Sequence, residues 1–192
     1  MEDFYMIDFK DTDIKTLSGV DAELRNMTGT DWNSYVLHVV KADELYLQYG
    51  CAPTEELIEC IGEMTPGVVY YLVYLKRKNV MVGYVGITPK TGNLEFYIFQ
   101  DFRKRGIGKA AVNLLIGLWF SGQITGEREQ KIEAETLSQN LASIRLLEKL
   151  GFQKKAVGLR MMLSEDEVNE RAISLYSYVL KNDAADEARC TE

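Results

Sequence analysis

The sequence predicts a single mixed α/β (α+β) domain with a mostly antiparallel central sheet flanked by helices. Three strand-like runs separated by turn residues lie between Val68 and Phe99, and an amphipathic helical pattern follows them at once. A strand, a helix and two further strands then extend to Leu180. The 192 residues contain no Pro-, Gly- or Ser-rich linker, so we expect one domain over residues 1–181.

The N-terminal third gives the weakest pattern. Phe4 to Phe9 is compatible with a short strand, and Val36 to Val40 favours a strand by its β-branched content. The stretch 18–30 is polar and ambiguous, whereas Thr54 can cap a helix whose first turn is acidic. At the other end, the polar and acidic residues 182–192 predict a flexible tail.

The middle of the chain predicts an antiparallel meander. Val68 to Leu75 and Val80 to Thr88 are rich in β-branched and aromatic residues, and the charged turn 76–79 joins them as a hairpin. A second turn, 89–93, leads into the third strand, Leu94 to Phe99. Three successive strands should therefore lie side by side.

The second half alternates helices and strands. Gly108 to Phe120 carries apolar residues at the i, i+3, i+4 and i+7 spacing of a helix that packs on a sheet. Lys131 to Leu137 indicates a strand, and a second helix, capped by Ser138 or Asn140, should end at Gly151. The two late strands are Phe152 to Leu163 and Ile173 to Leu180.

Composition and charge exclude several classes of function. The net charge of -7 opposes non-specific attraction to nucleic-acid phosphates and anionic lipid, so we expect no nucleic-acid or membrane partner. The acidic start lacks the basic region of a secretory signal, which predicts a cytoplasmic protein. Three cysteines without Cys-x-x-Cys spacing and one histidine support neither a disulfide framework nor a metal site. Any anionic ligand must meet a local basic cluster.

Such a cluster, Arg103 to Lys109, joins the third strand of the meander to the first helix. The first N–H groups of a helix have no internal partner, and glycines let the backbone approach a phosphate closely. A P-loop would need glycine in place of Arg103 and a hydroxyl in place of Ala110, so that alternative fails. A dinucleotide fingerprint, matched in part by Gly106 and Gly108, stays a distant alternative because an antiparallel meander precedes it. A solvated basic turn is the non-functional alternative.

The segment Arg103-Lys104-Arg105-Gly106-Ile107-Gly108 resembles the acetyl-CoA loop of the GNAT superfamily of N-acetyltransferases, Arg/Gln-x-x-Gly-x-Gly/Ala at a strand-to-helix junction. A second block, Asn140 to Phe152, has the Asn-x-x-Ser start and Glu-Lys-Leu-Gly-Phe end typical of the RimJ/RimL-like branch. The resemblance covers residues 68–180 well. It implies a GNAT-like fold in which two neighbouring parallel strands, here 94–99 and 131–137, splay apart to admit a pantetheine arm.

By this resemblance, acetyl-CoA is the co-substrate. Ile98 and Phe99 would offer backbone groups to the arm and the acetyl carbonyl, and Asn140 would bind the pantetheine amides. Ser143 would donate a proton or a hydrogen bond to the departing thiolate. Many relatives place a tyrosine on this helix for that task, and this sequence departs from them by having none. The cofactor-binding residues implied are Ile98, Phe99, Arg103, Lys104, Arg105, Gly106, Ile107, Gly108, Lys109 and Asn140.

Direct attack of an amine on a thioester in a ternary complex requires a base that deprotonates the ammonium group. Glu95 and Glu135, on the two splayed strands, are the candidates, and Ser143 is the third catalytic candidate. The sequence thus predicts an acetyl-CoA-dependent N-acetyltransferase acting on a small-molecule amine or a protein N-terminus. A non-catalytic acyl-CoA-binding module on the same fold is the alternative. Late strands of this family often mediate dimers, which leaves a homodimer open.

Overall fold

The computed structural model describes residues 14–26, 67–163 and 170–182. The strands and residues expected at Phe4 to Phe9, Val36 to Val40 and Thr54, and the tail after Asn182, lie outside this part. The described strands are β1 (Lys15–Thr16), β2 (Ala22–Asn26), β3 (Val69–Leu75), β4 (Val80–Thr88), β5 (Asn93–Ile98), β6 (Lys131–Leu137), β7 (Gln153–Leu163) and β8 (Glu170–Lys181). The described helices are η1 (Gln100–Phe102), α4 (Ile107–Phe120) and α5 (Leu141–Lys149).

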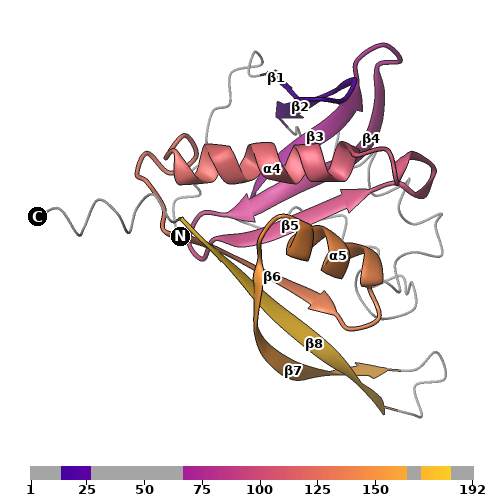
Figure 1. Ribbon diagram of the computed structural model, residues 1–192, viewed down its shortest axis with the longest axis vertical. Helices are drawn as coiled ribbons and strands as arrows, with labels where there is room; N and C mark the ends of the chain where they lie inside the picture. Colours follow the sequence, from indigo (N-terminus) through magenta and orange to yellow (C-terminus); the bar gives the residue numbers. More distant parts are fainter. Residues whose placement is uncertain (1–13, 27–66, 164–169, 183–192) are drawn as a thin grey trace, which may run out of the picture.

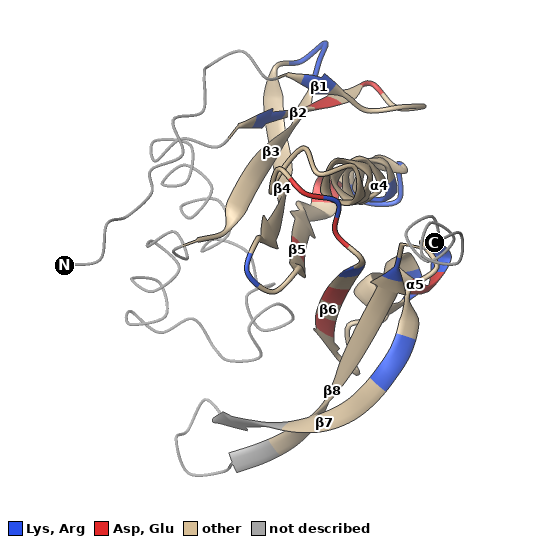
Figure 2. Cartoon of the chain, turned by 90° about the vertical axis from the view of Figure 1, so that its left-hand side faces the viewer, with Lys and Arg blue, Asp and Glu red and all other residues tan. Residues whose placement is uncertain are grey.

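The described strands form one sheet in the order β1-β2-β3-β4-β5-β6-β8-β7 (Figure 1). Figure 2 shows α4 and α5 together on one side of this sheet. β3, β4 and β5 pair antiparallel in succession, which confirms the predicted meander. The helix and strand predictions for the second half are confirmed within a few residues of their ends.

α4 packs on the meander through the apolar face that the sequence pattern indicates. Ala111, Val112 and Leu115 are fully buried in the main core cluster. Trp119 joins the same cluster, and its Nε1 donates to the Lys131 carbonyl at 2.9 Å, so α4 is also fixed to β6. These contacts place the N-terminus of α4 at the end of the sheet where β5 ends.

β2 has no clear prediction from the sequence, because its residues fall in the ambiguous polar stretch 18–30. Ala22 and Leu24 are fully buried, but Glu23 between them is buried as well. The Glu23 carboxylate accepts a hydrogen bond from Arg25 Nε at 2.7 Å, which compensates its charge. A polar residue paired in this way interrupts the apolar signal of a strand without preventing the strand.

β5 and β6 are the only parallel neighbours in the described sheet, and they separate after one aligned pair. Asn93 is aligned with Glu133, whose N–H donates to the Gly92 carbonyl at 2.9 Å. Beyond this point the described residues of the two strands are not paired, and Figure 1 shows the strands diverging. The splayed parallel pair that the resemblance implied is therefore present.

β8 pairs antiparallel with both β6 and β7, so the late strands complete the sheet. β8 begins at Glu170, three residues before the predicted start at Ile173. The ladder between β7 and β8 continues to the pair of Leu163 with Glu170. Backbone pairing between β7 and β8 thus extends to Glu170, a charged residue of low strand propensity.

Candidate active site

The loop between η1 and α4 directs backbone N–H groups outward. Lys104 and Gly106 adopt left-handed φ values of 59° and 79°. The first hydrogen bond of α4 runs from the Ala110 N–H to the Gly106 carbonyl at 3.0 Å, so the N–H groups from Ile107 to Lys109 precede it. α4 also has no side-chain cap and no acidic residue in its first turn. Its positive end is therefore available to an anion.

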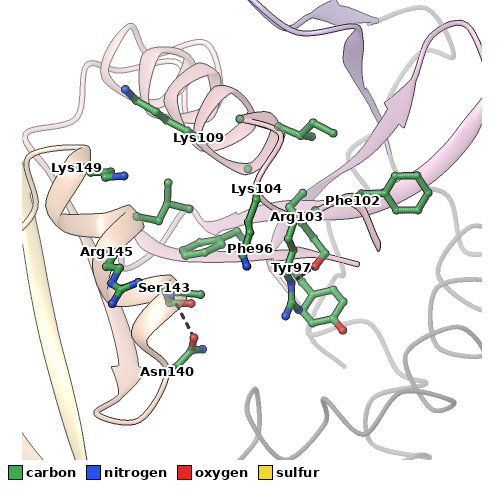
Figure 3. Close-up of a pocket in the computed structure, with 16 residues that line it drawn as sticks. Phe96, Tyr97, Phe102, Arg103, Lys104, Lys109, Asn140, Ser143, Arg145 and Lys149 are labelled. Carbon is green, nitrogen blue, oxygen red and sulfur yellow. Dashed lines mark hydrogen bonds between the residues drawn. The ribbon is translucent and has the colours of Figure 1, made fainter. Parts of the chain in front are cut away.

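These donors open into a cleft of about 510 Å³ between the loop, the end of β5 and α5 (Figure 3). Apolar side chains, among them Phe96, Ile98 and Leu146, line part of it. No Asp or Glu is among the described residues that line the cleft, whereas the chain as a whole has a net charge of -7. The cationic lining residues are Arg103, Lys104, Lys109, Arg145 and Lys149. The cleft therefore suits an anionic ligand with an apolar portion.

The backbone of Ile98 faces the gap between β5 and β6. The Phe99 N–H donates to the Val82 carbonyl of β4 at 2.9 Å. Backbone groups of successive strand residues point alternately to opposite neighbours, so the N–H and carbonyl of Ile98 point toward β6. Two residues were expected to offer backbone groups to a ligand. The backbone groups of Ile98 face the gap, whereas the Phe99 N–H is bound to β4.

Arg103 lines the cleft but directs its guanidinium to β5. Its Nε donates to the Ile98 carbonyl at 2.8 Å, and its guanidinium carbon lies 5.4 Å from the centre of the Tyr97 ring. Figure 3 shows Arg103 well separated from Lys109 and Lys149. The structure thus assigns Arg103 a contact with the strand backbone that the sequence did not predict.

Arg105 does not line the cleft. Its Nη2 donates to the Asp101 carbonyl at 2.8 Å, and its guanidinium lies 5.4 Å from the Phe102 ring centre. The predicted loop residues that line the cleft are Arg103, Lys104, Gly106, Ile107, Gly108 and Lys109. Gly108 is close to the opposite walls, since a Cβ there would lie 3.3 Å from Ile98 Cγ1 and 3.8 Å from Leu146 Cδ2.

Asn140 and Ser143 line the cleft at the start of α5. The Asn140 Oδ1 accepts a hydrogen bond from the Ser143 N–H at 3.2 Å, which confirms Asn140 as a cap of this helix (Figure 3). Because the capping bond uses the side-chain oxygen, the Asn140 amide can still donate hydrogen bonds through Nδ2. This arrangement is compatible with the contact to a ligand amide that was expected of Asn140.

Glu95 lies on the face of β5 opposite α4, because its neighbours Leu94 and Phe96 belong to the core that α4 covers. The Tyr70 hydroxyl donates to Glu95 Oε2 at 3.1 Å. Burial raises the pKa of the Glu95 carboxyl, and the Tyr70 hydrogen bond partly opposes this rise. Gly86 gives the Tyr70 ring its space, since a Cβ at Gly86 would lie 2.6 Å from that ring.

Glu135 lies on the same face of the sheet as Glu95, since the alignment of Asn93 with Glu133 sets the alternation of both strands. Its side chain is exposed, and it accepts a hydrogen bond from Ser177 Oγ at 3.2 Å. Neither carboxylate lines the cleft. The cleft and the two candidate bases are therefore on opposite faces, and the gap between β5 and β6 lies between them.

Tyr97, a strand aromatic for which the sequence also allows a place in a substrate cleft, lines the cleft. Six lining residues were not singled out from the sequence: Phe96, Phe102, Ala142, Arg145, Leu146 and Lys149. Four of them follow one helical periodicity from Ala142, at i, i+3, i+4 and i+7. The helix prediction together with the position of the second motif could have identified this face. Phe96 carries no such signal, because strand aromatics are common in cores, and Phe102 lies in the single turn of η1.

Residues 22–153 match the family model described as acetyltransferase (GNAT) domain. This match covers more than half of the chain, and the chain belongs to the GNAT acetyltransferase family. The matched region begins at β2, well before the start of the motif resemblance, and ends at the first residue of β7. A comparison with curated proteins gives no significant match.

Solved structures show the same fold at low sequence identity. The ribosomal-protein-S5-alanine acetyltransferase from Vibrio fischeri is 18% identical, with a TM-score of 0.63 over 85% of this chain and 94% of that one. The RimL ribosomal L7/L12 alpha-N-protein acetyltransferase in complex with coenzyme A is 16% identical, with a TM-score of 0.61 over 89% and 99%. The spermidine N-acetyltransferase from Vibrio cholerae, in complex with CoA and spermine, is 14% identical, with a TM-score of 0.66 over 85% and 96%.

In the part of the chain that the structure describes, no helix is long and apolar enough to cross a membrane. The His, Cys, Asp and Glu side chains of this part form no group of three that could hold a metal ion.

Proposed function

We propose that this protein transfers the acetyl group of acetyl-CoA to a primary amine, of a small molecule or a protein N-terminus, in a ternary complex. The observation that carries the proposal is the cleft: the N-terminal end of α4 and five cationic residues line it, and no acidic residue among the described residues does. A pyrophosphate suits this end of the cleft, and an extended arm suits the apolar path along Phe96 and Ile98 to the gap. A solvated basic turn, the non-functional alternative, would not require residues of the loop, β5 and α5 to line one cleft.

The Ile98 N–H supports the chemical step, because it points toward the gap. A donor aimed at the thioester carbonyl stabilises the negative charge that develops on its oxygen when the amine attacks. Arg103 stabilises the position of this strand end by binding the Ile98 carbonyl. We assign Arg103 a positioning role and the Ile98 N–H the contact with the acetyl group.

Of the two carboxylates, Glu95 is the better candidate base. Burial raises its pKa, which brings the proton affinity of the carboxylate closer to that needed to accept a proton near neutral pH. The Tyr70 hydroxyl fixes its orientation, whereas Glu135 is exposed and bound by Ser177. An amine that approaches on the Glu95 face would meet the thioester through the gap between β5 and β6.

Isothermal titration of the intact protein with CoA and acetyl-CoA tests the first part of this proposal. We expect saturable binding in the wild type. Gly108→Val should lose this binding, because the valine side chain would contact Ile98 and occupy the part of the cleft beside the loop. Absence of CoA binding to the folded wild type would refute the function. Lys78→Gln, in the exposed turn between β3 and β4, is a control for a change in net charge.

The second part requires turnover. The structural neighbours are named for spermidine and for ribosomal-protein N-termini, so the amine panel should contain polyamines and N-terminal peptides. Mass spectrometry should detect an acetylated product that is lost in Glu95→Gln and retained in Glu135→Gln. Binding of acetyl-CoA without turnover of any amine, unchanged in both variants, would instead support the acyl-CoA-binding module.

A further inference from the structure

α5 directs its charged side chains to different surroundings. Arg145 and Lys149 are one helical turn apart, and both line the cleft (Figure 3). Glu148 is not among the cleft residues. It lies near Tyr178 of β8, whose pKa is raised first by burial and then by the Glu148 charge. The wall that α5 presents to the cleft is therefore cationic, although the helix contains an acid.

The helix dipole favours Lys149 in the last turn of α5, but it does not explain why Arg145 lies one turn earlier on the same wall of the cleft. Like charges four residues apart on a helix repel each other and destabilise it. Within the described part of the chain, neither Arg145 nor Lys149 forms an ion pair, and both side chains are exposed. A bound anion between α5 and the loop would compensate these two charges.

A pyrophosphate does not need them. It would be held by the N–H groups from Ile107 to Lys109, with Lys104 and Lys109 on the same wall of the cleft. The guanidinium of Arg103 is used by the Ile98 carbonyl. Two cations, on the other wall, remain for a second anionic group of the ligand. Coenzyme A carries such a group, a phosphate monoester on its ribose, with about two negative charges at neutral pH.

We propose that Arg145 and Lys149 bind the ribose phosphate of coenzyme A and so make the protein selective for CoA over 3′-dephospho-CoA. This inference rests on the proposed function, because it assumes that CoA occupies the cleft. It adds two specificity-determining residues on α5 to the loop that holds the pyrophosphate.

The test is a cycle in which the ligand phosphate and the side chains are removed separately. Isothermal titration at one fixed ionic strength gives the Kd of CoA and of 3′-dephospho-CoA for the wild type, Arg145→Gln, Lys149→Gln and the double variant. Lys78→Gln, with the same loss of charge in an exposed turn, is the matched control. Circular dichroism confirms that each variant is folded.

We expect the wild type to bind CoA about tenfold more tightly than 3′-dephospho-CoA, as two charge-assisted contacts at an exposed site allow. The double variant should lose most of this ratio and keep its affinity for 3′-dephospho-CoA within about twofold. Lys78→Gln should leave the ratio unchanged. Equal binding of the two ligands by the wild type, or an equal weakening of both in the variants, overturns the assignment of the phosphate. Failure of the wild type to bind either ligand overturns the proposed function itself.

Discussion

Gly106 is the N-cap of α4 and Gly117 lies in its last turn, and their replacement by alanine should have opposite effects on stability. Gly106 has φ 79°, where a Cβ costs about 1–2 kcal/mol. The added Cβ would lie 3.6 Å from Val20 Cγ1, an ordinary contact, so backbone strain is the main cost. At Gly117 a Cβ would meet nothing within 4 Å, and alanine is favoured over glycine in a helix by about 1 kcal/mol.

Urea unfolding of the two variants measures this contrast. Their free energies of unfolding should differ by about 2–3 kcal/mol, which corresponds to a midpoint difference of about 1 M or more. Gly106→Ala should also weaken CoA binding, since strain at the cap reorients the N–H groups that follow it, whereas Gly117→Ala should leave the Kd within about twofold. Equal stability of Gly106→Ala and the wild type would refute the left-handed cap, and with it the geometry of the anion site.

Glu95, Arg103 and Asn140 each give a further test. Because burial raises the Glu95 pKa above 4.5, the folded state binds more protons than the unfolded chain from about pH 4.5 up through the raised value, and stability falls with rising pH in that window. Urea unfolding of Glu95→Gln should show a smaller fall; an identical pH profile would contradict the role of burial. Arg103→Gln, which keeps a donor for the Ile98 carbonyl, should retain a higher kcat than Arg103→Met, and equal kcat values would exclude the positioning role. Asn140→Ala should lose about 1 kcal/mol of unfolding free energy with the cap of α5, a loss that thermal unfolding would detect.

Local patterns explain why much of the fold could be predicted. The meander follows from β-rich runs and turn residues, and α4 from apolar spacing, because each signal lies within one short segment. The loop from Arg103 to Lys109 was predictable for the same reason: its glycines, its cations and the helix after it are contiguous. The capping bond from Ser143 to Asn140 is likewise a contact between residues three apart.

Contacts that depend on the path of the backbone were not predictable, even where the residues are five apart, as Arg103 and Ile98 are. The sequence gives Arg103 a charge beside a phosphate loop, but its guanidinium binds a strand carbonyl because η1 brings the two together. Alternation along β5 shows that Glu95 and Phe96 face opposite sides, yet it does not show which side the helices cover. That follows from the packing of α4 on Leu94 and Phe96.

The placement of the two faces constrains the reaction more than any single residue does. The cationic cleft lies on the face that α4 and α5 cover, and the Glu95 carboxylate lies on the other. If β5 and β6 were paired along their full length, a continuous ladder would separate the proposed cofactor from the proposed base. Because pairing stops after Asn93 and Glu133, the backbone of Ile98 borders an opening between them. In the proposed reaction, a thioester entering from the helix face and an amine entering from the Glu95 face would meet at this opening, so the splay would determine the position of the chemical step.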